Sequence, residues 1–287
     1  MLRRTLLFIP GSNPNMLQNA GILGSDTVIL DLEDAVAPTE KDAARFLTAN
    51  ALKRVKFGHT EVVVRINPLE TYAKEDLPVI VPAAPDAILL PKVQEARDIE
   101  LVSQELSRLE QEHQLNKEIS LFALIETPLG LSNALAIAKA NPRVKALALG
   151  AEDFTAGINA TRTKAGAEIA YARAALVTAA YAAGVQAIDT PFTDVNDEPG
   201  LIADTMLAKQ MGFTAKLAIN PRQVAAIQAV FTPSQQEIIW AQRVVEALEA
   251  GKARGLGAVS LDNKMIDLPI MLRATRLLDI AKSARLI

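Results

Sequence analysis

The chain has 287 residues, of which 50% are hydrophobic and 4% aromatic, and its formal net charge at pH 7 is −3. This small charge excludes a strong pull toward nucleic acid or an anionic membrane, and the absence of cysteine excludes disulfides and thiolate-bound metals. No apolar stretch is long enough to span a bilayer, and Pro10–Gly11 ends the one after Arg3–Arg4 too early for a signal peptide, so we expect a cytoplasmic enzyme.

The order of apolar stretches predicts eight strands, each followed by a helix. The apolar residues are mostly Ala, Leu, Ile and Val, which suits a parallel sheet covered by helices. Eight such units in series predict a (β/α)8 barrel, expected over residues 1–231. The predicted strands are Thr5–Pro10, Thr27–Asp34, Glu61–Asn67, Ala87–Lys92, Ser120–Thr127, Val144–Asp153, Gln186–Phe192 and Lys216–Asn220.

Helical spacing of apolar residues fills the segments between these strands. Two prolines, Pro78 and Pro82, predict that one of the helices is short or irregular. The predicted helices are Pro38–Phe57, Lys74–Ala83, Glu95–Gln114, Leu129–Ala140, Gly166–Ala183, Glu198–Met211 and Gln223–Phe231.

Residues 232–287 are predicted to form a helical extension or lid that packs on the barrel or on a neighbouring subunit. Ser234–Ala253 has the pattern of an amphipathic helix, and Ile270–Arg285 that of a final helix. The glycine-rich stretch Gly251–Gly257 between them is expected to be mobile.

Polar and charged residues follow each predicted strand. In barrels of this kind, active sites lie at the carboxyl ends of the strands, so we expect these side chains to converge at one rim. Polar loops alone explain the polar residues after any single strand, but polar residues after all eight strands favour a functional rim. These residues are Ser12, Asn13, Glu33, Asp34, Arg65, Asn67, Lys92, Glu126, Glu152, Asp153, Asp189, Asn220 and Arg222.

Glu126 and Asp153 follow consecutive predicted strands, which are neighbours in a barrel. Two carboxylates with several waters are common ligands of Mg²⁺ and leave positions for substrate oxygens. Mn²⁺ accepts the same oxygen ligands. The alternative is that these carboxylates form ion pairs with Arg65, Lys92 or Arg222.

Arg65 ends a strand that is otherwise too apolar to need a charge. Its guanidinium has the geometry to bind a substrate carboxylate through two hydrogen bonds. A salt bridge to Glu33 or Asp34 is the alternative, and both hold if these carboxylates orient the arginine.

The two histidines do not have the pattern of catalytic groups. His59 precedes a strand and therefore falls at the opposite end of the barrel, and His113 lies in a charged helix end. Acid–base chemistry would then come from carboxylates or from oxygen bound to a metal. The chain also contains no GxGxxG or Walker loop that would indicate a nucleotide site.

Several motifs are spread over nearly the whole chain. They are LRRTLLFIPGSNP, LDLEDAV, VVRINPL, LLPK, IETPLG, LALGAEDF, AINPRQ and VSLDNKMIDLP. Together they resemble citrate lyase β subunits and the related malyl-CoA and citramalyl-CoA lyases. The resemblance implies a (β/α)8 barrel, usually trimeric, that binds Mg²⁺ and cleaves a 3-hydroxy-acyl thioester.

The resemblance also implies roles for individual residues. Glu126 and Asp153 match the metal ligands, and Arg65 matches the residue that holds the carboxylate of the oxo acid. Glu33 and Asp34 match a pair that supports the network of metal and substrate.

Asp267 of the MID motif matches an acid that CoA-type lyases supply from the C-terminal lid of a neighbouring subunit. An alternative from the residues themselves is that Asp267 caps the final helix ahead of Pro269. The sequence leaves both open.

The implied reaction is a retro-Claisen cleavage of citryl thioester to oxaloacetate and an acetyl thioester, with Asp267 returning a proton to the departing carbon. The thioester arm belongs to coenzyme A or to an acyl-carrier protein of a citrate lyase complex. Rim candidates for contacts with this arm are Arg3, Arg4, Ser12 and Lys92. The alternatives are malyl-CoA or citramalyl-CoA cleavage, a metal-dependent aldolase acting on free 2-oxo acids, and a mainly structural subunit.

Overall fold

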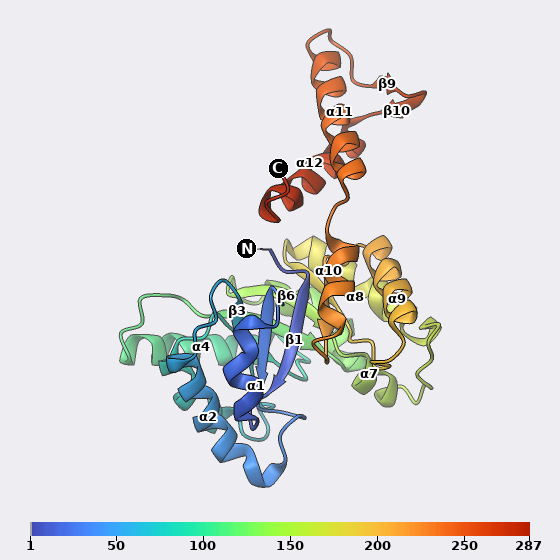
Figure 1. Cartoon of the computed structure of the whole chain (residues 1–287). Coiled ribbons are helices and arrows are strands. Elements are labelled where there is room, and N and C mark those ends of the chain that lie inside the picture. Colours follow the sequence, from blue (N-terminus) through green and yellow to red (C-terminus); the bar gives the residue numbers. More distant parts are fainter. Residues whose placement is uncertain (1) are drawn as a thin grey trace. The chain divides into compact units, whose positions relative to one another are not determined.

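The structure, a computed structural model, describes residues 2–287 and confirms the predicted (β/α)8 barrel (Figure 1). The eight strands pair in parallel in chain order, and the last strand pairs with the first to close the barrel. They are β1 Thr5–Pro10, β2 Thr27–Asp31, β3 Glu61–Arg65, β4 Ala87–Leu90, β5 Ser120–Ile125, β6 Val144–Leu149, β7 Gln186–Asp189 and β8 Ala215–Ala218.

Helices connect successive strands and cover the outside of the barrel (Figure 1). The α-helices are α1 Pro14–Asn19, α2 Lys41–Arg54, α3 Ala73–Ile80, α4 Ala96–Glu112, α5 Pro128–Ser132, α6 Ala134–Lys139, α7 Ala151–Gly157, α8 Ala170–Ala183, α9 Glu198–Met211 and α10 Gln223–Phe231. Four short 3-10 helices are η1 Ala20–Ile22, η2 Pro38–Glu40, η3 Val81–Ala83 and η4 Ala167–Ile169.

Some predicted boundaries were wrong. The strand predicted over Val144–Asp153 ends at Leu149, and Asp153 lies in the first turn of α7. The helix predicted over Leu129–Ala140 is divided into α5 and α6 at Asn133. The first correction matters most, because it places Asp153, a candidate metal ligand, on a short helix and not at the end of a strand.

Alternate side chains of the strands fill the barrel interior. Twelve buried residues form this core, and Phe8 of β1 packs against it from the rim. The alternation follows from the period of two along a strand and leaves the intervening apolar residues to pack against the helices. The core residues are Leu6, Ile29, Val63, Ala87, Leu89, Phe122, Leu124, Ala146, Ala148, Ile188, Ala215 and Leu217.

The chain separates into two compact units, of which residues 3–228 form the larger and residues 229–287 most of the smaller. The smaller unit contains helices α11 Gln235–Lys252 and α12 Leu268–Ser283, with the hairpin β9 Val259–Leu261 and β10 Lys264–Ile266 between them. The hairpin was not predicted. Within residues 2–287, no helix combines the length and apolar character needed to span a membrane.

Candidate active site

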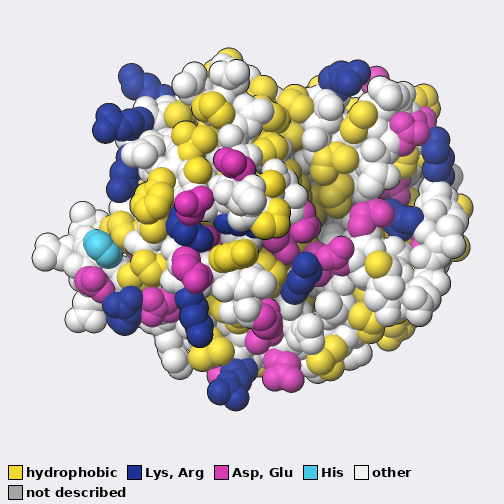
Figure 2. All heavy atoms as spheres, turned by 90° about the horizontal axis from the view of Figure 1, so that it is seen from below, with side chains coloured by type: hydrophobic (Ala, Val, Ile, Leu, Met, Phe, Trp, Pro, Cys, Tyr) yellow, Lys and Arg dark blue, Asp and Glu magenta, His cyan; other side chains and the backbone are white. Residues whose placement is uncertain are grey.

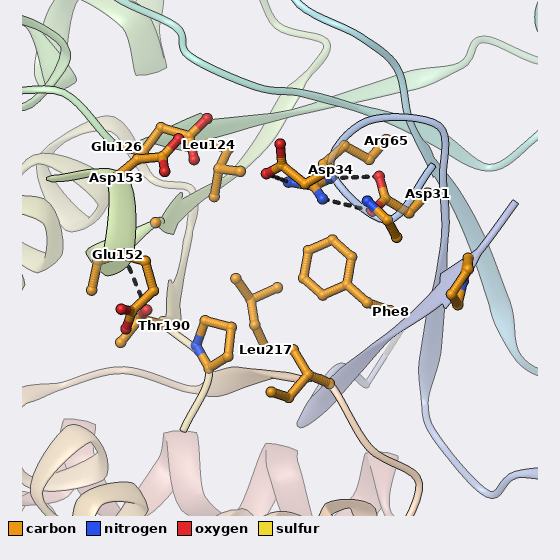
Figure 3. Close-up of a pocket in the computed structure, with 16 residues that line it drawn as sticks. Phe8, Asp31, Asp34, Arg65, Leu124, Glu126, Glu152, Asp153, Thr190 and Leu217 are labelled. Carbon is orange, nitrogen blue, oxygen red and sulfur yellow. Dashed lines mark hydrogen bonds and ion pairs between the residues drawn. The ribbon is translucent and has the colours of Figure 1, made fainter. Parts of the chain in front are cut away.

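A pocket of about 410 Å³ lies where β1, β2, β3, β5, β6, β7 and β8 end. Acidic and basic side chains gather around the centre of this face of the molecule (Figure 2). Figure 3 shows how the lining side chains point into the pocket. They are Phe8, Pro10, Asp31, Asp34, Ala35, Arg65, Leu124, Glu126, Gly150, Ala151, Glu152, Asp153, Thr190, Pro191, Leu217 and Ile219.

Arg65 is held by Asp31, a residue that the sequence analysis did not single out. The register of β2 and β3 places the two residues opposite each other at the ends of their strands. Arg65 donates from Nε to Asp31 Oδ1 at 2.7 Å and from Nη2 to Asp31 Oδ2 at 2.6 Å. Its guanidinium also lies 4.9 Å from the ring centre of Phe8 (Figure 3). These contacts fix the arginine by two hydrogen bonds and a cation–π contact.

Two further carboxylates face the other edge of Arg65. Its Nη1 lies 2.7 Å from Glu33 Oε2 and 3.4 Å from Asp34 Oδ2. Burial would lower the pKa of Arg65, but Asp31, Glu33 and Asp34 outweigh that effect and raise it. The predicted salt bridges of Arg65 to Glu33 and Asp34 are thus present. Burial is also the main reason why the pKa of Glu33 is raised.

Glu126 is a buried carboxylate of the pocket with a raised pKa. It follows β5, is 4% exposed, and accepts a 2.7 Å hydrogen bond at Oε1 from the backbone N–H of Lys92. Burial, followed by the charges of Glu33 and Asp153, raises its pKa to about 8. Gly150 lies so close that an added Cβ would be 2.5 Å from Glu126 Oε2. A glycine at this position therefore makes room for the carboxylate.

Asp153 lies on the same side of the pocket as Glu126 (Figure 3). It belongs to the first turn of α7, where the helix dipole favours a negative charge. Its Oδ2 is 3.6 Å from Lys92 Nζ, and the same ammonium is 3.2 Å from Glu33 Oε1. The alternative of an ion pair is therefore realised for Asp153, through Lys92.

The donor set at this side of the pocket fits a hard divalent cation. In the described part of the chain Glu126 has no ion-pair partner, and both Arg65 and Lys92 are engaged by other carboxylates. A buried carboxylate beside further carboxylates is expected to attract a cation. Within residues 2–287, no three His, Asp or Glu side chains are grouped as ligands for one ion. Glu126 and Asp153 are the two carboxylates that could hold such an ion.

The other predicted site residues are not all at the pocket. Arg4 lies at the amino end of β1, where its guanidinium pairs with Asp26 at 2.7 Å. Because the strands run away from that end, the structure does not bring Arg4 to the rim, which corrects the expectation for it. Arg3 is at the same end and pairs with Glu61. Ser12 lies in the turn after β1, on the pocket side.

Asp267 lies in the smaller unit and caps α12. Its Oδ1 accepts a hydrogen bond from the backbone N–H of Ile270 at 3.2 Å. The capping alternative is thus present in the structure. His59 precedes β3, and His113 follows α4, so neither histidine lies at the carboxyl-end rim.

A cluster of four charges, of which Arg173, Asp189 and Lys216 are buried and Asp204 is partly buried, supports the wall of the pocket at β7. Arg173 of α8 donates to both carboxylate oxygens of Asp189 at 2.9 Å, and the ammonium of Lys216 lies 2.6 Å from Asp204. Asp189 ends β7 and is followed by Thr190, which accepts a hydrogen bond from the backbone N–H of Ala151 at 3.2 Å. The two cations and two anions compensate one another, so the cluster holds the β7 terminus in place.

The fold and this rim define a (β/α)8-barrel protein whose ligand pocket lies at the carboxyl ends of the strands. The chain belongs to the HpcH/HpaI aldolase/citrate lyase family, whose model matches residues 4–221. This membership and the relatives below confirm the resemblance inferred from the sequence motifs, and they make the protein a carbon–carbon lyase.

The chain is 42% identical to citrate lyase subunit beta of Leuconostoc mesenteroides subsp. cremoris, covering 100% of this chain and 95% of that protein. It is 35% identical to the mitochondrial citramalyl-CoA lyase of Rattus norvegicus, covering 99% of this chain and 87% of that protein. The fold is similar to a crystal structure of CitE from Mycobacterium tuberculosis in complex with magnesium, acetoacetate and coenzyme A, with a TM-score of 0.79. The sequence identity is 31%, and the match covers 98% of each chain.

Proposed function

We propose that the protein cleaves a 3-hydroxy-acyl thioester, in a Mg²⁺-dependent reaction, to a 2-oxo acid and an acetyl thioester. Citryl thioester, which yields oxaloacetate, is the first candidate substrate, because relatives 39–42% identical are citrate lyase beta subunits. The observation that carries the proposal is the buried Glu126, which lies beside Asp153 and has no ion-pair partner in the described chain.

Glu126 and Asp153 are the proposed ligands of the metal. Mg²⁺ suits their oxygen atoms, and Mn²⁺ suits the same pair. The CitE structure from M. tuberculosis with magnesium supports this choice. When bound, the ion supplies a Lewis acid that polarises the hydroxyl or carbonyl oxygen at the bond to be broken.

Arg65 is the proposed anchor of the substrate's acid group. Asp31 occupies Nε and one N–H of Nη2, while Glu33 and Asp34 lie at Nη1. A substrate carboxylate would therefore take the second N–H of Nη2, or replace Asp34, the more distant of these two carboxylates, at Nη1. The charge that develops on the oxo acid then faces a fixed cation.

Cleavage requires the substrate hydroxyl to lose a proton and the departing acetyl carbon to gain one. We propose that Glu33 and Asp34 support the network around the hydroxyl. The family resemblance assigns the second proton to Asp267, in the same or a neighbouring subunit of a homotrimer. Ser12 remains a proposed contact of the thioester arm, which belongs to coenzyme A or to an acyl-carrier protein of a citrate lyase complex.

Citramalyl thioester is a second candidate, because of the lining of the pocket. Among the described residues that line it, Arg65 is the one basic side chain, and the opposite wall is apolar, with Leu217, Pro191 and Ile219. Citryl carries a negatively charged carboxymethyl group where citramalyl carries a methyl group. An apolar wall suits the methyl group better than an unpaired charge.

The test is product formation from citryl-CoA, (S)-citramalyl-CoA and (S)-malyl-CoA, each with and without Mg²⁺. Asp153→Ala should abolish metal-dependent cleavage, whereas Asp42→Ala, which removes an exposed carboxylate of α2, should not change it. Cleavage that needs no metal or survives in Asp153→Ala would contradict the proposed site. Complete inactivity of the folded protein on all three thioesters would direct the search to carrier-bound or free-acid substrates, or to a structural subunit.

A further inference from the structure

Lys92 has a backbone conformation that is unfavourable for a residue with a side chain. It follows β4 and Pro91, and its φ is +53°, in the left-handed region. A non-glycine residue in this region costs conformational energy, and such residues gather at functional sites. The backbone N–H of the same residue donates a hydrogen bond to Glu126 Oε1, at 2.7 Å.

The side chain of the same residue reaches two other carboxylates. Its Nζ lies 3.2 Å from Glu33 Oε1 and 3.6 Å from Asp153 Oδ2. Lys92 therefore contacts one carboxylate with its backbone and two with its ammonium group.

These contacts matter because the carboxylates would repel one another once Glu126 loses its proton to bind a cation. Glu33 and Asp153 are the like charges that raise the pKa of Glu126 after burial itself. Arg65 does not relieve this repulsion at Asp153, since its ion pairs are with Asp31, Glu33 and Asp34. The side chain of Asp153 is 45% exposed, and Lys92 is its one ion-pair partner among residues 2–287. Without the ammonium, Asp153 would turn toward solvent and away from Glu126.

We propose that Lys92 is a positioning residue of the cation site, rather than a contact of the thioester arm. Its backbone N–H fixes the carboxylate of Glu126, and its ammonium draws Asp153 toward that carboxylate, so that the two ligands are held together before the cation arrives. This inference rests on the proposed function, because it takes Glu126 and Asp153 as the metal ligands. Partners of this kind, which orient metal ligands without binding the metal, strongly affect metal affinity.

The first test measures Mg²⁺ and Mn²⁺ binding to the metal-free protein by titration calorimetry. Lys92→Met should weaken binding about tenfold or more. Lys117→Met is the matched control, because Lys117 is a similarly exposed lysine, paired with Asp86 at 2.9 Å far from the pocket rim. Unchanged or tighter binding by Lys92→Met would overturn the inference, since the ammonium would then be neutral or a competitor of the metal. Absence of binding by the wild type would instead refute the proposed metal site.

The second test separates positioning from stability. Lys92→Gly keeps the N–H, removes the ammonium and relieves the left-handed strain, and Ala84→Gly relieves the same strain at a residue whose φ is +52°. Both variants should melt at a temperature equal to or above that of the wild type, and only Lys92→Gly should bind metal more weakly. Wild-type metal affinity in Lys92→Gly would contradict the inference.

Discussion

The substitution Gly150→Ala tests most directly how the pocket is built. Gly150 has φ −99° and ψ 86°, so alanine meets no barrier from the backbone conformation itself. The new Cβ would lie 2.5 Å from Glu126 Oε2 and 2.6 Å from Glu126 Cβ. Rotating the carboxylate relieves only the first of these overlaps, because Glu126 Cβ is fixed to the backbone at the end of β5.

Carbon atoms in contact are about 3.5–4.0 Å apart, so the backbone after β5 or β6 must shift by about 1 Å. Overpacking of a dense interior typically costs about 1–3 kcal/mol of stability. The same shift would displace Glu126 from the Lys92 N–H. We therefore expect Gly150→Ala to melt at a lower temperature and to bind Mg²⁺ or Mn²⁺ about 100-fold more weakly, at the upper end of the effect expected for support of a metal ligand.

Thermal unfolding followed by circular dichroism, together with calorimetric titration of Mn²⁺, measures both effects. Gly157→Ala, at the other end of α7, is the matched control, because its Cβ would meet Pro128 at an ordinary 3.4 Å. It should bind metal like the wild type and unfold at the same or a slightly higher temperature. If Gly150→Ala matched this control in both measurements, the close packing of Gly150 on Glu126 would not govern the site.

Two further predictions concern titration and capping. The folded, metal-free protein keeps a proton on Glu126 up to about pH 8, and the unfolded chain releases it near pH 4.5. The free energy of unfolding of the metal-free protein should therefore fall as the pH rises through this window. Over the same window Mg²⁺ should bind more tightly as the pH rises, and its binding should release about one proton. Calorimetry in buffers of different ionisation enthalpy measures that proton release. Glu126→Gln should lose both effects, and their persistence would assign them to another group. Asp267→Asn should keep the cap of α12 and the melting temperature but lose cleavage, whereas Asp267→Ala should also lose about 1 kcal/mol of stability. Full activity of Asp267→Asn would leave Asp267 a capping role alone.

The barrel and its rim were predictable because they depend on local patterns. Each strand is an apolar stretch that ends in polar residues, and consecutive strands of a parallel barrel are neighbours. The sequence therefore predicts that Glu126 and Asp153 lie on the same side of the rim, as they do in the structure. The direction of the strands carried equally useful information about Arg4, since residues that precede β1 must lie at the opposite end.

The remainder of the site depends on strand register and backbone conformation, which could not be predicted from the sequence alone. Asp31 was read as the interior of an apolar strand, and its role follows only from the register that sets it opposite Arg65. The left-handed backbone of Lys92 is not favoured by its side chain, and tertiary contacts impose it. The change from strand to helix at Gly150 was missed because the apolar stretch runs up to it without a proline or a capping side chain.

The charged side chains of the pocket and one of its apolar walls come from different parts of the barrel. Asp31, Arg65, Glu126 and Asp153 follow or end strands between β2 and β6, whereas Pro191, Leu217 and Ile219 come from β7, β8 and the residues after them. Substitutions at Pro191, Leu217 and Ile219 are therefore expected to alter the choice of substrate, while the groups proposed to bind the acid and the cation stay unchanged.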